Sequence, residues 1–138
     1  MIGVILTGHG SFASGLTSNM ELIVGPQENY TAIDFKDAGS VDLLDRKLSQ
    51  AVEDLAACSG ILIFTDLLNG TPFNLSVRLT MSDPRIRLVH GVNAAMLIDA
   101  CTSRADEEDV DRLAQAAIEL GRDQIGIFRL TEIEEDEL

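Results

Sequence analysis

The sequence has little cysteine and little histidine, and this shortage excludes two ways of holding a small protein together. Only two cysteines, Cys58 and Cys101, occur in 138 residues, far apart, without CxxC spacing and without clustered histidines. The sequence therefore predicts neither a disulfide framework nor a metal site. We expect both thiols to be reduced and buried as small apolar groups, as is typical of a cytoplasmic protein.

Positive charge is also scarce, and no apolar run is long. The chain has 10 Lys and Arg against 23 Asp and Glu, a formal net charge of −13 at pH 7. Such a charge argues against nucleic acid and anionic lipid as partners. The apolar runs are far shorter than a membrane span, and "MIGVIL" lacks the basic start of a signal peptide. We therefore expect a cytoplasmic domain that does not insert into a membrane.

What the sequence does contain is an alternation of short apolar runs with stretches of helical periodicity. The runs predict strands at 2–6, 29–35, 60–66, 85–91 and 124–130, and the periodic stretches predict helices at 11–25, 40–57, 93–103 and 109–122. Another helix is expected to begin with Thr71 as cap and Pro72 in first position, and Gly121 is expected to end the helix at 109–122. In the first helix, Ile23 is placed on the apolar stripe. The alternation predicts a three-layer α/β fold, a mainly parallel sheet with helices on both faces.

Ten of the 23 acids fall in two blocks, "DEEDVD" at 106–111 and "EIEEDEL" at 132–138. The first block is expected to open a helix, because carboxylates favour the positive end of the helix dipole. The second is expected to be a solvated tail. The sequence thus predicts one domain over residues 1–130 and an acidic tail over residues 131–138.

Chemistry-bearing residues follow three of the predicted strands. His9 stands in "TGHG" after the first strand, Asp66 ends the third, and His90 follows the fourth. Sites in parallel α/β sheets gather beyond the carboxyl ends of the strands, and the first and third strands are commonly neighbours. We therefore expect His9 and Asp66 to meet at one edge of the sheet.

The turn around His9 allows three interpretations. It is a tight strand-to-helix turn with no chemistry, or it binds a dinucleotide, or His9 is itself a nucleophile. Residues 8–13 fit G-x-G-x-x-A after a strand, and Asp34 stands where an acid for the ribose is expected. A P-loop is excluded because no lysine follows Gly15, and G-x-S-x-G does not occur.

The nucleophile interpretation requires a proton held on one ring nitrogen while the other takes a phosphoryl group. Asp66 could accept that N–H and steady the positive charge that develops on the ring. Backbone N–H groups at the helix starts after Gly10 and Gly70 would contact the phosphoryl oxygens, and Thr71 could add a hydroxyl.

Four stretches together, "ILTGHGSFASGL", "AIDF", "FTDLLNGTPFN" and "HGVNAAML", resemble the IIA component of the mannose family of the bacterial phosphoenolpyruvate-dependent sugar phosphotransferase system (PTS). The resemblance covers residues 1 to about 130. It implies a phosphocarrier, a component of a phosphotransferase, that accepts a phosphoryl group from the small carrier HPr. The carrier then passes this group to a histidine of the IIB component, which phosphorylates the sugar that the IIC and IID membrane components import.

The resemblance also implies a site without cofactor or metal. His9 would be phosphorylated, with Asp66 bound to its other ring nitrogen, and the phosphoryl group would lie against Gly10, Ser11, Leu68, Asn69, Gly70 and Thr71. Members of the family are dimers that exchange their last strand, so residues 124–130 would form an antiparallel strand in a partner's sheet.

Two residues depart from the family pattern. Asn69 stands where glycine is frequent, and His90 where a small or uncharged residue is expected. We interpret His90 as structural or rim-lining. No linker or IIB domain is visible after residue 130, so a free-standing subunit is expected. The motifs around His9 and Asp66 resemble those of members that serve N-acetylgalactosamine or other amino sugars more than those of the mannose proteins. The sugar itself stays open among these and mannose, fructose, sorbose and gluconate-type systems.

Three further alternatives stay open at this point. The phosphocarrier subunit of a PTS-dependent dihydroxyacetone kinase shares the fold, although the "DLLNGTPFN" block argues against it. A small dinucleotide-binding module would use Asp34, and a regulatory sensor would be phosphorylated without passing the group on. Phe12, Leu68 and Phe73 are either docking contacts for a partner or core residues.

Overall fold

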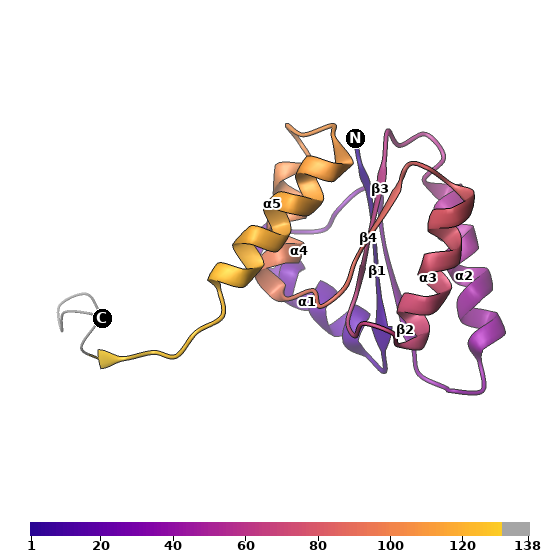
Figure 1. Ribbon diagram of the computed structural model, residues 1–138, viewed down its shortest axis with the longest axis horizontal. Helices are drawn as coiled ribbons and strands as arrows, with labels where there is room; N and C mark the ends of the chain where they lie inside the picture. The colour runs from indigo at the N-terminus through magenta and orange to yellow at the C-terminus, as the bar shows by residue number, and fades with distance from the viewer. Residues whose placement is uncertain (131–138) are drawn as a thin grey trace.

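The computed structural model describes residues 1–130 and has three layers, a parallel sheet between two groups of helices (Figure 1). The strands are β1 (Gly3–His9), β2 (Tyr30–Phe35), β3 (Ile61–Thr65) and β4 (Ile86–Val89), in the order β2-β1-β3-β4. The helices are α1 (Phe12–Val24), α2 (Val41–Asp54), α3 (Thr71–Ser82), α4 (Ala94–Ser103) and α5 (Val110–Asp123). The predicted α/β class, the parallel sheet and the helices on both faces are confirmed.

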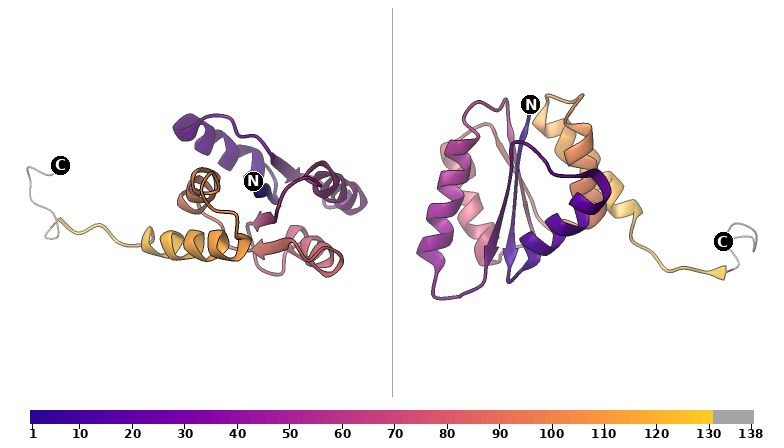
Figure 2. Two further views of the ribbon diagram at one scale, coloured as in Figure 1. Left: turned by 90° about the horizontal axis from the view of Figure 1, so that it is seen from above. Right: turned by 180° about the vertical axis from the view of Figure 1, so that it is seen from behind.

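The apolar runs form strands because the sheet is covered on both faces, as is usual for parallel strands. Successive residues of β1 point to opposite faces: Leu6 belongs to one core cluster and Ile5 to the other. The first cluster includes residues of α1, α4 and α5, and the second includes residues of α2 and α3. Figure 2 shows these two helix groups on opposite sides of the sheet. All four strands end at the same edge, where His9 is the last residue of β1.

The start of α3 differs by one residue from the prediction. Thr71 is the first helical residue rather than the cap, and Gly70 is the capping residue with φ −74° and ψ 167°. Pro72 therefore falls one position later in the first turn, where its missing N–H is equally harmless. In α1, Ser11 stands at the cap position as expected, but Ile23 is 61% exposed and lies off the buried stripe.

Gly121 does not end α5, which continues to Asp123. A Cβ at this position would lie 2.3 Å from Cγ of Met96 in α4. The glycine therefore allows α4 and α5 to pack closely and does not end the helix. The sequence alone does not reveal this packing requirement. The acidic block does open α5 as predicted, because the Asp109 side chain caps it by accepting the N–H groups of Asp111 and Arg112.

The predicted fifth strand is wrong for the single chain. Residues 124–130 follow α5 as an extended segment that leaves the body of the molecule (Figure 1), without strand pairing. They cannot add to their own sheet from that position, so antiparallel pairing with a partner stays a prediction. The predicted acidic tail, residues 131–138, lies outside the described residues. Over residues 1–130, no helix has the length and apolar character needed to cross a membrane.

Candidate functional site

His9 and Asp66 meet at the carboxyl edge of the sheet, as the sequence predicted. β1 and β3 are hydrogen-bonded neighbours with Thr7 opposite Thr65, so the next residues along both chains come together. Nδ1 of His9 lies 2.9 Å from Oδ2 of Asp66. The His9 side chain is 42% exposed and that of Asp66 is 12% exposed. The ring is thus reachable from solvent while the carboxylate that holds it is largely covered.

The Asp66 carboxylate is held by backbone donors as well as by the ring. The backbone N–H of His9 donates to Oδ2 at 2.8 Å, and the N–H of Leu67 donates to Oδ1 at 2.8 Å. Burial by itself raises the pKa of Asp66, but these hydrogen bonds outweigh it and leave the pKa below its ordinary value. An ionised Asp66 can only accept, so a neutral His9 ring carries its proton on Nδ1. Its Nε2 then presents a lone pair.

The start of α3 lies against the same ring. A Cβ at Gly70 would come within 2.6 Å of Cε1 and 3.3 Å of Nε2 of His9, so only glycine leaves room here. The loop before it turns tightly, with the N–H of Gly70 donating to the Leu67 carbonyl at 3.2 Å. Asn69 has φ 67°, in the left-handed region that asparagine tolerates best among residues with a side chain. This explains how the departure from glycine at this position is accommodated.

The glycine turn after His9 is also tied to the sheet. Gly10 has φ 60°, and its N–H donates to the carbonyl of Phe35 at the end of β2, at 2.7 Å. The Phe35 ring contacts the His9 ring edge to face, with centroids 5.9 Å apart. The Gly10 N–H is already bound to Phe35 and is therefore not free to donate to a phosphoryl group. The space around Gly10 is open, so this residue could still leave room for one.

The structure therefore brings His9, Asp66 and Gly70 into one site. Thr71 begins α3 directly after Gly70, and Leu68 is 54% exposed in the preceding loop. Ser11 is the exposed cap residue of α1 and makes no side-chain capping bond. That Gly10, Ser11, Leu68, Asn69 and Thr71 bind a phosphoryl group stays a prediction.

Other residues named from the sequence take different places. His90 is exposed beyond β4 and contacts the Phe73 ring edge to face at 5.7 Å. Phe12 packs against the core cluster of α1, α4 and α5, whereas Leu68 and its neighbour Leu67 are exposed. Over residues 1–130, no group of three His, Cys, Asp or Glu side chains is placed to hold a metal ion.

The sequence did not identify the support that β2 gives to the site. The Asp34 carboxylate accepts the backbone N–H of Ser14 at 2.9 Å and the Ser14 hydroxyl at 2.6 Å, and it pairs with Lys36 at 3.9 Å. An acid engaged in this way is not free for a ribose hydroxyl, which argues against the dinucleotide interpretation. The only signal in the sequence was the position of Asp34 at the end of a strand.

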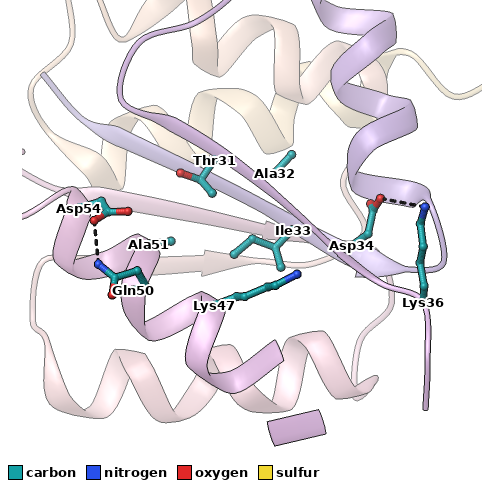
Figure 3. Close-up of a pocket in the computed structure, with 9 residues that line it drawn as sticks. All are labelled: Thr31, Ala32, Ile33, Asp34, Lys36, Lys47, Gln50, Ala51 and Asp54. Atoms are coloured by element: carbon teal, nitrogen blue, oxygen red, sulfur yellow. Dashed lines mark hydrogen bonds and ion pairs between the residues drawn. The ribbon is translucent and has the colours of Figure 1, made fainter. Parts of the chain in front are cut away.

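Neither groove described below is centred on His9. The larger, of about 600 Å³, lies between β2 and α2 and includes Lys36, Lys47 and Asp54 in its lining (Figure 3). A second groove, of about 260 Å³, lies beside β4 and includes His90 and Arg122. The His9 ring instead stands at an open edge, which suits a group presented by another protein.

The chain matches a family model over residues 3–118, and the family is described as "PTS system fructose IIA component". The "PTS system mannose-specific EIIAB component" of Escherichia coli (strain K12) is 29% identical over 133 residues, which cover 96% of this chain and 41% of that relative. The chain thus spans less than half the length of that relative. The "PTS system fructose-specific EIIA component" of Bacillus subtilis (strain 168) is 31% identical over 104 residues, covering 75% of this chain and 71% of the relative.

Solved structures agree with these relatives. Phosphotransferase system component EIIA from Streptococcus agalactiae superposes with a TM-score of 0.85 at 37% identity, covering 93% of this chain and 98% of that one. The mannose/sorbose specific IIA subunit from Enterococcus faecalis superposes with a TM-score of 0.80 at 27% identity, covering 96% and 98%.

Proposed function

Because the chain belongs to the IIA components of the mannose family of the PTS, we propose that it is a phosphocarrier in which His9 carries the phosphoryl group. The observation that supports this most directly is the His9–Asp66 pair. The carboxylate accepts the Nδ1 proton and leaves Nε2 as the nucleophile, pointing toward the start of α3.

In the proposed transfer, the Nε2 lone pair attacks the phosphorus of a phosphohistidine on the donor protein. The new P–Nε2 bond forms as the donor's P–N bond breaks, and the donor nitrogen keeps the electron pair of that bond. The Nδ1 proton stays in place, so the ring becomes positively charged and the Asp66 carboxylate balances it. Onward transfer is the same reaction in reverse, with an acceptor histidine in the place of the donor.

The phosphoryl oxygens are proposed to be bound at the α3 start. Gly70 leaves space beside Nε2, and no side chain caps this helix. The free N–H groups and the positive end of the helix dipole favour a dianion, and the Thr71 hydroxyl can add a donor. This arrangement needs neither metal nor cofactor.

HPr is the proposed donor and a IIB component the proposed acceptor, with IIC and IID components acting on the sugar in the membrane. This follows from the family, since the relatives are named as EIIA or EIIAB components of mannose, fructose and sorbose systems. We also propose a cytoplasmic location, where such partners would meet it. The carrier site never contacts sugar in this scheme, so the sugar itself stays open.

We further propose a homodimer in which residues 124–130 of each copy form an antiparallel strand along β4 of the other. Within residues 1–130, β4 is an edge strand, and the segment after α5 reaches away from the body with its apolar side chains exposed. An unpaired apolar segment and an unpaired strand edge are complementary.

The test is a phosphorylation assay with phosphoenolpyruvate, enzyme I and HPr, measured by intact mass and acid lability. We expect one acid-labile phosphate on the wild-type protein and none on His9→Ala. His90→Ala is the matched control, since the chain has only two histidines, and it should accept phosphate normally. Phosphate on folded His9→Ala, or none on the wild type, would refute the proposal.

A second assay separates a carrier from a sensor. Purified phosphoprotein is mixed with a cognate IIB component, and a carrier should lose its phosphate to IIB. Retention of the phosphate with every IIB tested would instead favour a regulatory sensor.

A further inference from the structure

Two helices, α1 and α3, begin at the sheet edge that carries His9, but the N–H groups of their first turns have different hydrogen-bond partners. In α1 the cap residue Ser11 makes no side-chain capping bond. Asp34, at the end of the neighbouring β2, supplies the cap instead, accepting the Ser14 backbone N–H at 2.9 Å and the Ser14 hydroxyl at 2.6 Å. The first-turn N–H groups of a helix otherwise lack partners, so a carboxylate from another strand takes the role of a local cap.

The charge of Asp34 strengthens this cap. The side chain is only 19% exposed, and Lys36 approaches it to 3.9 Å at one end of the groove in Figure 3. Burial raises the pKa of Asp34, but the Ser14 hydroxyl, the backbone hydrogen bonds and the Lys36 charge together leave the pKa below its ordinary value. An ionised carboxylate at this point also interacts favourably with the α1 dipole.

The backbone on either side of the turn is tied to the same strand. The N–H of Gly10 donates to the Phe35 carbonyl, one residue beyond Asp34. The residue directly after His9 and the first turn of α1 are therefore both bound to the end of β2. By contrast, α3 has no side-chain cap, and its cap residue Gly70 lies against the His9 ring.

We infer that Asp34 is a positioning residue that holds the turn after His9 and reserves phosphoryl binding for the start of α3. A phosphoryl group at α1 would have to displace a bound carboxylate and would be repelled by its charge. Among residues 1–130, no side-chain carboxylate caps α3, so its donors are left for a phosphoryl group. The part of the inference that concerns phosphoryl binding rests on the proposed function, whereas the capping of α1 by Asp34 does not.

The capping is tested on the unphosphorylated protein by amide hydrogen exchange. Loss of a cap exposes the first-turn N–H groups, so Ser14 in Asp34→Ala should exchange about fivefold faster than in the wild type. Asp54→Asn makes the same change of charge at the C-terminal end of α2, elsewhere along the groove of Figure 3, and should leave Ser14 exchange unchanged. Unaltered Ser14 exchange in Asp34→Ala would overturn the inference.

The positioning is tested by phosphoryl transfer from HPr and by amide chemical shifts of the phosphoprotein. In single-turnover transfer, Asp34→Ala should lower the maximal rate about tenfold because the His9 turn is displaced, with the apparent Kd for phosphorylated HPr changed less than about twofold. Asp34→Asn keeps an oxygen for the Ser14 N–H and should recover part of the loss. If Asp34→Ala fails to fold, Asp34→Asn takes its place with smaller expected effects, Ser14 exchange about twofold faster and transfer about threefold slower, because the charge–dipole interaction is lost while the Ser14 N–H keeps an acceptor.

Phosphorylation of the wild type should shift the Thr71 and Phe73 amides and leave those of Ala13 and Ser14 nearly unchanged. In Asp34→Ala the Ala13 and Ser14 amides should shift as well, because their N–H groups become available. Equal shifts at both helices in the wild type, or a wild-type rate of transfer in Asp34→Ala, would overturn the inference. If the wild type takes no phosphate, the proposed function fails, and Ser14 exchange still decides whether Asp34 caps α1.

Discussion

At the scale of single residues, the proposed phosphoryl transfer depends on which nitrogen of His9 is left without a proton. Asp66 Oδ2 accepts both the Nδ1 proton and the His9 backbone N–H, and Leu67 holds the other oxygen. The carboxylate thus has a fixed orientation before any partner arrives. Ring orientation and tautomer are set in the resting protein, which would lower the reorganisation needed for the proposed transfer.

Substitution of Asp66 should therefore slow phosphorylation without abolishing it. In Asp66→Ala the ring loses its orienting partner, and we expect transfer from HPr to fall roughly 10- to 100-fold. Asp66→Asn should be slower still, because its amide can donate to Nδ1 and would place the ring proton on Nε2. Rapid-quench transfer kinetics measure both variants, with circular dichroism to verify folding. Complete loss in a folded Asp66→Ala protein would contradict a purely orienting role.

The His9–Asp66 pair could be predicted because it follows from topology alone. Residues that end neighbouring parallel strands must meet, and the apolar runs before His9 and Asp66 identify them as strand ends. The role of Asp34 could not be predicted in this way. Its contact with Ser14 depends on how α1 is placed relative to the end of β2, and no sequence pattern indicates that placement.

At the scale of elements, the four strands and five helices within residues 1–130 follow the predicted order with shifts of a few residues at their ends. The errors have a common cause. Local rules predict Gly121 as a helix stop, whereas its position opposite Met96 is a tertiary requirement. The segment at 124–130 has strand-forming residues, but a strand exists only where another strand pairs with it.

One tertiary element that joins helix and sheet is the buried side chain of Arg104. It follows α4, is 2% exposed, and donates to the carbonyl oxygens of Ile2, Glu28 and Asn29 at the starts of β1 and β2. Over residues 1–130 no carboxylate forms an ion pair with it. The guanidinium thus closes the sheet edge opposite the His9 site by satisfying backbone carbonyls.

Replacement of Arg104 should cost far more stability than replacement of an exposed arginine. Arg104→Met fills similar volume but leaves buried carbonyl oxygens without donors, and we expect the free energy of unfolding to drop by about 3 kcal/mol. Urea denaturation measures this, with Arg112→Met as control. In the described part of the chain, Arg112 forms one surface ion pair, with Asp109, and its replacement should change stability by less than about 0.5 kcal/mol. A loss below about 1 kcal/mol for Arg104→Met would show that solvent reaches these carbonyls.

At the scale of the whole molecule, the compact body and the segment after α5 have opposite character. The body buries its apolar residues in two core clusters, one on each face of the sheet. The segment leaves Ile125, Ile127, Phe128 and Leu130 between 60% and 76% exposed. Several large apolar side chains side by side on an exposed segment are unfavourable in an isolated chain, and they are favourable if a second copy covers them.

The proposed dimer should therefore depend on this segment and not on exposed apolar residues elsewhere. We expect the wild type to sediment at about twice its 14.9 kDa chain mass. The double substitution Ile127→Glu/Phe128→Glu should shift it to the monomer, because carboxylates cannot be buried along the partner's β4 at low cost. Leu22→Glu on α1 is the matched control, since Leu22 is 89% exposed and lies outside the segment, and it should sediment like the wild type. Sedimentation equilibrium distinguishes these species. A monomeric wild type at micromolar concentration would refute strand exchange, whereas a double variant that remains dimeric would move the interface to another face and leave the segment without a role in assembly.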